Sequence, residues 1–319
     1  MKQTSRGQPL LSIVVPLYQN EQSLPHTTPK LLELIESIDT HQSELIFVDD
    51  GSTDRSFELA SQYQKQNPAV IRIVKLTRNY GQTPATQAGL AHCKGDCAVI
   101  ISADLQDPYQ RIPEMLKHWL EGAKYVLAYR EDRDESKLHA FISGLYWKLI
   151  ANFGIKGFPR SGYDFCLLDR QVIDEINKIA EKNTSIFPLI YWLGYQPTLM
   201  PITRRERQHG TSQWTFLKKV RLTLDTLFAF TYLPVRIITY SAIGTALAST
   251  TYFSWVLIRW LAFGSPVRGW TSIVLISLCL GSVTLFALGI LCEYVWRILD
   301  EIRKRPNYVV ELVEEESAP

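Results

Sequence analysis

The 319-residue sequence predicts an α/β domain with a mainly parallel sheet, followed by an amphipathic helix and two membrane-spanning helices. Three observations lead to this prediction. Short apolar runs alternate with helical patterns through residues 1–120, as they do in βαβ units. An amphipathic stretch then precedes two long stretches without charge. The expected parts are a domain over 1–212, an amphipathic juxtamembrane helix over 213–232, a two-helix anchor over 233–299 and a tail over 300–319.

The strands and helices of the domain follow from two periodicities. Fully buried strands read as short apolar runs bounded by turn residues, and amphipathic helices place apolar residues at three- and four-residue steps. The helix expected at 56–66 also follows the capping residues Ser52, Thr53 and Asp54. The expected strands are 11–16, 44–48, 70–76, 98–102 and 126–129, and the expected helices are 31–38, 56–66 and 83–91.

Polar residues gather where four of these strands end. In open α/β sheets, ligands bind beyond the carboxyl ends of the strands, so these clusters are candidate ligand contacts. Asp and Gly are also ordinary turn formers, which is the alternative interpretation of any single cluster. The four clusters are 18–21, 49–54, 78–82 and 104–107.

The clusters favour some chemistries over others. The sequence contains neither Gly-x-Gly-x-x-Gly nor a Walker-type lysine motif, which disfavours a dinucleotide oxidoreductase and a P-loop ATPase. Asp50 can accept hydrogen bonds from a nucleobase or ribose. The motif at 102–107, Ser-Ala-Asp-Leu-Gln-Asp, offers carboxylate and amide oxygens that suit Mg²⁺ or Mn²⁺. Such an ion offsets the charge that develops on a departing diphosphate.

Charge is unevenly distributed around the apolar stretches 237–258 and 270–292, although the formal net charge is only +2. Each stretch is long enough to cross a hydrocarbon core about 30 Å thick. Basic residues cluster just before the first stretch, at 204–221, and such residues usually stay cytoplasmic. We therefore expect an integral membrane protein with two spans, and with the domain and both termini in the cytoplasm. The stretch 213–232 is expected to lie in the membrane interface, with a surface helix packed on the domain as the alternative.

A resemblance makes these expectations more specific. The motifs that carry it are Ser12-Ile13-Val14-Val15-Pro16, Glu21, Val48-Asp49-Asp50-Gly51-Ser52-Thr53-Asp54, Arg78-Asn79-Tyr80-Gly81-Gln82 and Ala103-Asp104-Leu105-Gln106-Asp107-Pro108. They resemble the inverting nucleotide-sugar glycosyltransferases of family 2, which have the Rossmann-like GT-A fold. The resemblance is closer to the polyisoprenyl-phosphate branch, which includes dolichol-phosphate mannosyltransferase and bacterial bactoprenol glucosyltransferases. It extends over nearly the whole chain and favours the bactoprenol type.

The resemblance implies roles for individual positions. Nucleotide-sugar contacts are implied for Pro16, Tyr18, Glu21, Asp50, Arg78, Asp104, Gln106 and Arg204. The divalent ion would be held by Asp104, Gln106 and the position of Ser102, and the acceptor phosphate by Arg130, Arg133 and Arg207. Arg130 and Arg133 also fit plain surface charges in a loop rich in Glu, Asp and Arg.

Asp104 and Asp164 are the implied catalytic residues. For Asp164 a general base is the familiar proposal, but a phosphate monoester with a second pKa near 6 is already largely dianionic at pH 7. A nucleophile without a proton to lose needs no base, so we favour positioning of the metal or acceptor, with base catalysis second and a turn-capping carboxylate as the structural alternative. Three positions depart from the family's pattern: Ser102 and Cys166 stand where aspartate and arginine are common, and Gln213 replaces a usual lysine.

The implied reaction moves a hexose, in the first place glucose from UDP-glucose, onto a membrane polyprenyl phosphate such as undecaprenyl phosphate. The expected partners are the nucleotide sugar, the lipid and the membrane, with no nucleic acid. Small residues at 244, 248, 281 and 289 would permit a homo-oligomer through close helix contacts. Alternatives are a GDP-mannose-dependent mannosyltransferase and a catalytically weak membrane adaptor. A processive polysaccharide synthase would normally add a Gln-x-x-Arg-Trp motif and more spans.

Overall fold

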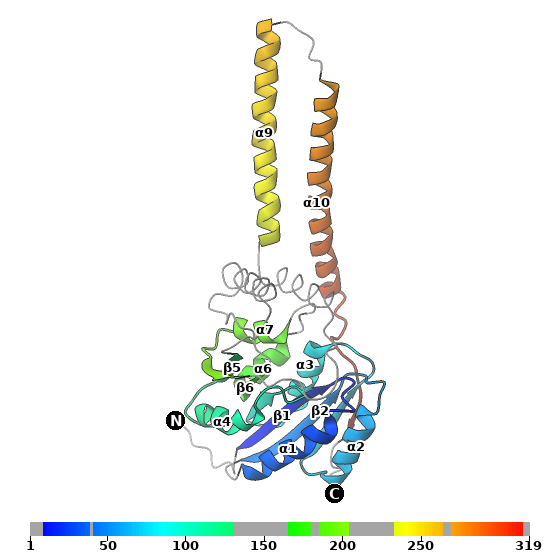
Figure 1. Cartoon of the computed structure of the whole chain (residues 1–319), viewed down its shortest axis with the longest axis vertical. Helices are drawn as coiled ribbons and strands as arrows, with labels where there is room; N and C mark the ends of the chain where they lie inside the picture. The colour runs from blue at the N-terminus through cyan, green and yellow to red at the C-terminus, as the bar shows by residue number, and fades with distance from the viewer. Residues whose placement is uncertain are drawn as a thin grey trace. The chain divides into compact units, whose positions relative to one another are not determined.

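The structure is a computed structural model that describes residues 9–38, 41–130, 165–179, 181, 185–203, 233–263 and 269–314. The chain forms two compact units, Met1–Thr226 with Pro306–Pro319, and Leu227–Arg305. All described strands belong to the first unit, and two long helices make up the described part of the second (Figure 1). Each unit is described by itself below.

Within the described residues, the first unit contains one mixed sheet of eight strands in the order β7-β5-β6-β4-β1-β2-β3-β8. Its centre is parallel, because β1 pairs in parallel with both β2 and β4, and β2 pairs in parallel with β3. The two strands that run against their neighbours are β6 and β8. The strands are β1 Leu10–Leu17, β2 Gln42–Asp49, β3 Ile71–Leu76, β4 Cys97–Ile100, β5 Tyr125–Arg130, β6 Phe165–Asp169, β7 Thr198–Ile202 and β8 Val310–Glu314.

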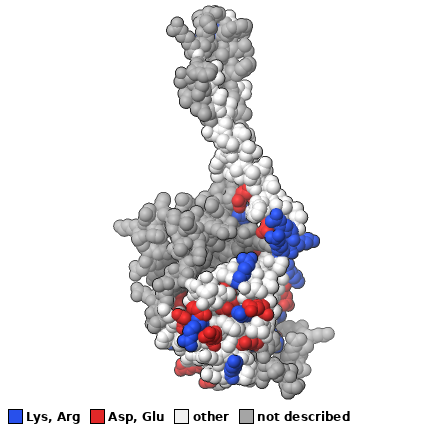
Figure 2. Space-filling model, turned by 90° about the vertical axis from the view of Figure 1, so that its right-hand side faces the viewer, with Lys and Arg blue, Asp and Glu red and all other residues white. Residues whose placement is uncertain are grey.

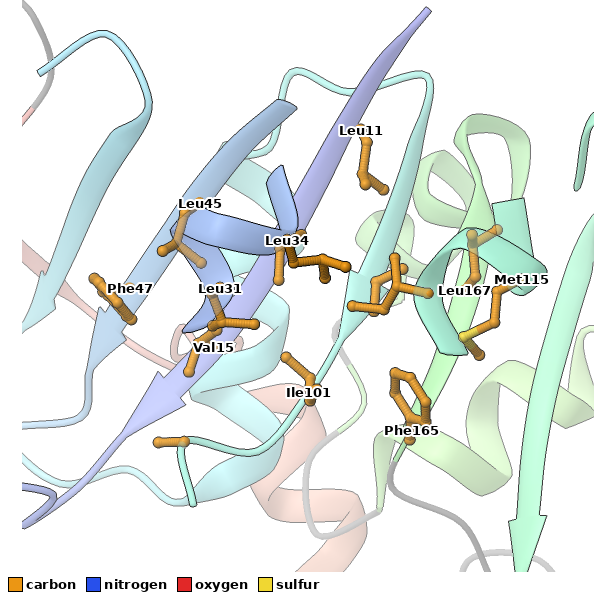
Figure 3. Close-up of a cluster of buried hydrophobic side chains, with 14 of the residues drawn as sticks. Leu11, Val15, Leu31, Leu34, Leu45, Phe47, Ile101, Met115, Phe165 and Leu167 are labelled. Carbon is orange, nitrogen blue, oxygen red and sulfur yellow. The ribbon is translucent and has the colours of Figure 1, made fainter. Parts of the chain in front are cut away.

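Helices cover both faces of this sheet. They are α1 Leu24–Ser37, α2 Ser56–Gln66, α3 Gln82–His92, α4 Ile112–Leu120, α6 Arg170–Lys178 and α7 Ile186–Trp192, with a 3-10 turn at Tyr109–Arg111. On one face, apolar side chains of α1 and α4 pack on those of β1, β2 and β6 (Figure 3). On the other face α3 lies against β1 and β2. A Cβ at Gly89 would lie 2.3 Å from Val14 and 2.9 Å from Val48, so the missing side chain permits this close approach.

The core on the α1 face consists almost entirely of side chains removed from solvent. Leu31, Phe47 and Phe165 are among the members with no exposed surface, and each comes from a different element. Burying a side chain of this size stabilises the fold by about 1.5–3 kcal/mol. The sheet is therefore a rigid platform, and the loops at its carboxyl ends are mounted on fully packed strands.

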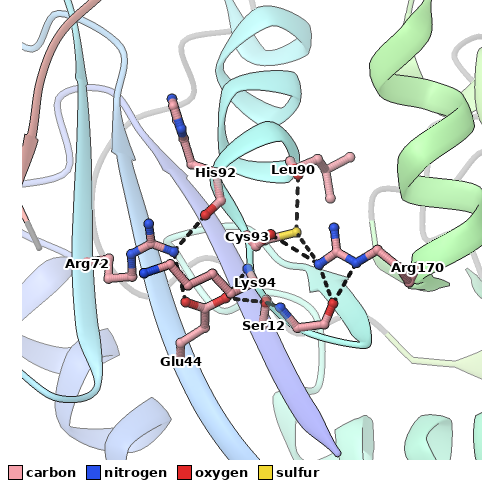
Figure 4. Close-up of polar contacts among 9 residues, drawn as sticks. Ser12, Glu44, Arg72, Leu90, His92, Cys93, Lys94 and Arg170 are labelled. Carbon is pink, nitrogen blue, oxygen red and sulfur yellow. Dashed lines mark hydrogen bonds and ion pairs between the residues drawn. The ribbon is translucent and has the colours of Figure 1, made fainter.

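A buried ion pair lies near the amino ends of the same strands (Figure 4). The Arg72 guanidinium of β3 is 3.0 Å from the Glu44 carboxylate of β2 and also donates to the His92 carbonyl at 2.6 Å. Ser12 of β1 donates to the same carboxylate at 2.5 Å, and the Lys94 backbone N–H donates to it at 2.6 Å. Four segments far apart in the sequence are thus joined at the edge of the sheet opposite the polar clusters.

The second unit contains α9 Leu233–Phe263 and α10 Trp270–Ile302. At 1.5 Å per residue, helices of 31 and 33 residues are about 45–50 Å long. Among the described residues, one segment, Leu280–Ile302, has the length and hydropathy of a membrane span. Large apolar side chains are exposed along both helices, and the visible described surface of this unit is mostly uncharged (Figure 2).

The expected α/β class with a mainly parallel sheet is confirmed, as are strands at all five expected places. One helix boundary was wrong: α1 begins at Leu24 rather than residue 31, because Pro25 suits the first turn, and the helix continues through Pro29. The tail expected over 300–319 is not separate from the sheet, since β8 pairs with β3. The expected amphipathic helix at 213–232 lies outside the described residues.

Candidate active site

The four polar clusters lie at one edge of the sheet. β1, β2, β3 and β4 are parallel neighbours, so their carboxyl ends meet at the same edge. β1 is central, with Leu17 in register with Asp49 of β2 and the Ile101 N–H donating to the Val14 carbonyl. The loops that follow these strands form the candidate site.

Two of these loops are locked together through Asp50. One carboxylate oxygen of Asp50 accepts a hydrogen bond from the Tyr80 backbone N–H at 2.7 Å, and the other accepts one from the Gly81 N–H at 2.8 Å. Asp50 itself is only 3% exposed. The loop after β3, residues 77–81, is thereby held by a carboxylate that follows β2. We call residues 77–81 the donor loop, because Arg78 in it is expected to contact the nucleotide-sugar donor.

Gly51 brings the same two loops into backbone contact. Its φ is +64°, a left-handed conformation that favours glycine, and a Cβ there would lie 2.4 Å from the Arg78 carbonyl carbon and 2.6 Å from the Asn79 nitrogen. No side chain fits between these backbones. The Arg78 guanidinium stacks over the Tyr80 ring at 4.4 Å, so both side chains of the donor loop face the same region.

A second interlock joins the loop after β1 to the start of α2. The Gln19 N–H donates to the Ser52 hydroxyl at 3.1 Å, and the Asn20 N–H donates to the Ser56 hydroxyl at 2.7 Å. The Arg55 N–H donates to the Glu21 carboxylate at 3.2 Å. Glu21, expected to contact nucleotide, therefore also anchors the first turn of α2.

The acidic loop after β4 has its own hydrogen bonds. Ser102 donates to Asp104 Oδ1 at 2.8 Å, and the Gln106 N–H donates to the same oxygen at 3.3 Å. Ser102 also lies 3.5 Å from Asp107 Oδ2. Leu105 adopts φ +45°, a left-handed conformation that costs a residue with a side chain about 1–2 kcal/mol. Thr27 of α1 donates to the Ala103 carbonyl at 2.6 Å and ties this loop to the domain.

Burial controls the charge at the centre of the site. It raises the pKa of Asp50 to about 6, although the Tyr80 and Gly81 N–H groups stabilise the ionised form. The neighbouring Asp49 carboxylate adds to the upward shift. Burial likewise raises the pKa of Asp49, opposed by its hydrogen bonds from Ser52. Protonation of Asp50 therefore occurs close to physiological pH and changes the group that holds the donor loop.

The acidic loop has donor chemistry that fits a divalent ion. Asp104, Ser102 and Gln106 supply carboxylate, hydroxyl and amide oxygens, which Mg²⁺ and Mn²⁺ prefer. Among the described residues, no group of three or more His, Cys, Asp and Glu side chains could hold a metal by itself. Mg²⁺ sites commonly combine one or two carboxylates with substrate phosphates and water, so this sparse set is compatible with an ion that arrives with a nucleotide.

The structure places eight of the expected site residues on this edge. Partly buried Pro16 lies in β1, Tyr18 and Glu21 follow it, Asp50 and Arg78 follow β2 and β3, and Ser102, Asp104 and Gln106 follow β4. Arg130 is the last residue of β5, in register with Ile202. Arg133, Asp164, Arg204 and Arg207 lie outside the described residues, as does Gln213. Cys166 is fully buried in β6 opposite Ile100 and Leu127, so its thiol belongs to the packed sheet.

Sequence reasoning did not assign the residues that connect the loops. Ser52 and Ser56 receive the N–H groups of the first loop, and Thr27 fixes the acidic loop. Their hydroxyls are the common feature that marks them. Ser52 was noted as a capping signal and as part of a polar cluster and motif, but without a role of its own, and nothing in the apolar pattern around Thr27 points to a residue 76 positions away.

The chain is similar in sequence to several known glycosyltransferases. The chain is 33% identical over 301 residues to the SfII prophage-derived bactoprenol glucosyl transferase of Shigella flexneri, covering 94% of this chain and 97% of that protein. It is 31% identical over 304 residues to a prophage bactoprenol glucosyl transferase homolog of Escherichia coli K12, covering 95% and 99%. An uncharacterized glycosyltransferase of Bacillus subtilis, YkcC, is 34% identical over 301 residues, covering 94% and 93%.

Among solved structures, a glucosyl-3-phosphoglycerate synthase from Mycobacterium tuberculosis with Mn²⁺, UDP-glucose and phosphoglyceric acid gives a TM-score of 0.49 at 17% identity, over 69% of this chain and 79% of that one. The profile of glycosyl transferase family 2 matches residues 12–176, more than half of the chain. That match contains β1 from Ser12 onward, β2 to β6 and all four polar clusters. The chain belongs to glycosyl transferase family 2, has a GT-A-like α/β fold and is a glycosyltransferase.

Proposed function

We propose that the protein transfers glucose from UDP-glucose to the phosphate of a membrane polyprenol, with inversion at the anomeric carbon. The observation that carries this proposal is the interlocked edge formed by Asp50, Gly51 and the donor loop, beside the acidic loop with Asp104. The named relatives supply the substrate class, since two of them are bactoprenol glucosyl transferases or homologs that align over nearly their full length.

The residues divide the work between the two ends of the donor. Asp50 and the donor loop, with Tyr18 and Glu21, receive the nucleoside, and Arg78 lies beside its phosphates. Asp104 and Gln106, with the Ser102 hydroxyl, would hold a divalent ion that accompanies the diphosphate. When bound, that ion offsets the negative charge on the leaving diphosphate. Arginine suits both the donor diphosphate and the acceptor phosphate because its planar guanidinium donates two parallel hydrogen bonds.

The reaction is a single displacement. An oxygen of the acceptor phosphate forms a bond to the anomeric carbon as the bond from that carbon to the diphosphate breaks, and the electron pair leaves with the nucleoside diphosphate. Arg130, Arg133 and Arg207 position the acceptor, Arg204 contacts the donor, and Asp164 positions the reacting groups. Because well-oriented reactants can gain roughly 7–11 kcal/mol, positioning is the main contribution we assign to the protein.

We further propose that α9 and α10 both span the membrane, with the catalytic unit and both chain ends in the cytoplasm. The 31 and 33 residues of these helices exceed the length of about 20 that a span requires. Their exposed apolar side chains would be solvated by lipid, and the basic residues that precede α9 favour a cytoplasmic face. This arrangement holds the enzyme at the surface where a lipid-borne phosphate is found.

The experiment that tests the function is a donor and acceptor screen. Full-length protein in lipid nanodiscs is incubated with undecaprenyl phosphate, Mg²⁺ and radiolabelled UDP-glucose, UDP-galactose or GDP-mannose. We expect label in the lipid fraction from UDP-glucose, as a β-linked monosaccharide. Label from GDP-mannose alone would support the mannosyltransferase, long polymer would support a synthase, and no lipid label from any donor would support the adaptor.

A further inference from the structure

We propose that the C-terminal segment, residues 307–314, positions the donor loop. The affinity for nucleotide would then depend on residues that follow both long helices in the sequence. The inference rests on the proposed function in one respect: the donor loop is taken to contact the nucleotide. The segment itself belongs to the first unit, together with the sheet. It follows α10 in the sequence and is not part of the region that the family profile matches.

The segment holds the strand that leads into the donor loop. β8 pairs antiparallel with β3, with Val74 opposite Val313 and Lys75 opposite Leu312. The pairing continues into the loop, because the Thr77 N–H donates to the Val309 carbonyl at 3.0 Å. The Lys75 ammonium also lies 3.1 Å from the Glu311 carboxylate. The first residue of the donor loop is therefore fixed by the C-terminal segment.

The segment also contacts the helix that leaves the donor loop. α3 begins at Gln82, directly after Gly81. The Asn307 side-chain amide donates to Gln87 Oε1 at 3.2 Å and to the Glu181 carbonyl at 3.3 Å. Gln87 is only 5% exposed, so Asn307 bonds to a buried position on α3. Residues 307 and 309 thus hold the elements on both sides of the loop.

The donor loop lies between two supports of different origin. Asp50 and Gly51 hold it from the β2 side, and the C-terminal segment holds its two flanking elements from the β3 and α3 sides. Without residues 307–314, β3 loses its partner on that side and Thr77 loses the acceptor of its N–H. The loop would then occupy its binding conformation for a smaller fraction of the time. Apparent affinity falls in proportion to that fraction, so a tenfold drop in occupancy raises the apparent Kd about tenfold.

The test compares two truncations of the full chain in nanodiscs. One ends at Arg305 and lacks the segment; the matched control ends at Glu314 and lacks only the residues after β8. We expect the Arg305 truncation to raise the Kd for UDP with Mn²⁺, and the KM for donor, about tenfold, with the KM for acceptor unchanged. Amide hydrogen exchange at Tyr80 and Gly81 should become faster. A synthetic peptide of residues 306–319, added in trans, should restore both the nucleotide affinity and the slow exchange.

A side-chain variant keeps the proposal testable if the truncated chain does not fold. Asn307→Ala removes the bonds to Gln87 and to the Glu181 carbonyl while leaving β8 in place. Asn177→Ala is its control, because Asn177 also donates to α3, at the Leu90 carbonyl in the last turn of the helix. We expect a KM for donor about two- to threefold higher in Asn307→Ala only.

The proposal is overturned if the Arg305 truncation and its control show equal amide exchange at Tyr80 and Gly81 and equal UDP affinity. If the truncated chain does not fold, the same comparison is made between Asn307→Ala and Asn177→Ala, and equal values again overturn the proposal. The exchange measurement needs no substrate. If amide exchange is faster in the truncation but neither the full-length protein nor any variant turns over the donor, the positioning role of residues 307–314 is supported and the proposed reaction is contradicted.

Discussion

Replacing Gly51 by alanine tests the contact on which the candidate site depends. The added Cβ would lie 2.4 Å from the Arg78 carbonyl carbon, 2.6 Å from the Asn79 nitrogen and 2.7 Å from the Arg78 Cα. All three atoms are backbone, so no flexible side chain can move aside. To reach an ordinary contact of 3.4 Å, the donor loop must move away by about 1 Å.

The cost of that movement follows from the hydrogen bonds at Asp50. The Tyr80 and Gly81 nitrogens lie 2.7 and 2.8 Å from the carboxylate, and a shift of about 1 Å takes both beyond hydrogen-bonding distance. A hydrogen bond to a charged group is worth about 1.5–3 kcal/mol, so losing two destabilises the closed loop by about 3–6 kcal/mol. The left-handed conformation of residue 51 adds about 1–2 kcal/mol.

Gly122→Ala is the matched control for this experiment. Gly122 also has a positive φ, +105°, but a Cβ there would meet nothing within 4 Å, so the variant carries strain without a clash. Amide exchange at Tyr80 and Gly81 should accelerate at least about a hundredfold in Gly51→Ala, since 1.4 kcal/mol is a factor of ten. UDP affinity should fall with it. Identical exchange at these two amides in Gly51→Ala and Gly122→Ala would refute the proposed contact.

Four further outcomes are expected. Because the pKa of Asp50 is raised to about 6, the donor KM should rise as pH falls below 6, and Asp50→Asn should remove that dependence. The folded chain keeps the Asp50 proton to higher pH than the unfolded chain, so ionisation of Asp50 lowers the stability of the fold as pH rises from 3.8 to about 6. The unfolding temperature, measured relative to that of Asp50→Asn, should therefore fall as pH rises through that window. Arg72→Met removes the cation beside the buried Glu44 carboxylate and should lower the free energy of unfolding, measured with denaturant, by about 3–5 kcal/mol. Lys178→Met breaks an exposed ion pair and should change the free energy of unfolding by less than about 0.5 kcal/mol. Equal changes in the two variants would contradict the account of the buried pair. Asp104→Asn should weaken Mn²⁺ binding in the presence of UDP at least about tenfold, read from the free Mn²⁺ signal in electron paramagnetic resonance, and unchanged binding would remove Asp104 from the metal site.

The parallel centre of the sheet was predictable because its strands are short runs of buried apolar residues, each followed by a polar cluster. Topology then brought the clusters together without further information, since parallel neighbours end at one edge. The interlock itself was not predictable. Asp50 is 30 residues from Tyr80, and periodicity does not reveal that both carboxylate oxygens would accept N–H groups of the next loop.

Among the described strands outside the parallel centre, β5 was predicted, but β6, β7 and β8 were not, for a different reason. β6 is a five-residue run that inserts antiparallel between β4 and β5, and its neighbours depend on chain order that a local pattern does not contain. β8 was expected to be part of the tail over 300–319, which follows the two long apolar stretches in the sequence. In the structure the backbone of this strand pairs with β3 whatever its side chains are.

The composition of β8 suits a strand at the end of the described sheet. Edge strands expose unpaired N–H and C=O groups, and charges and short length are common protections against pairing with another chain. β8 has five residues, and the side chain of Glu311 is half exposed. An apolar strand at this place would extend the sheet just as well but would invite a second copy to pair. The charges on β8 thus protect from further pairing the strand that closes this side of the described sheet, next to the donor loop.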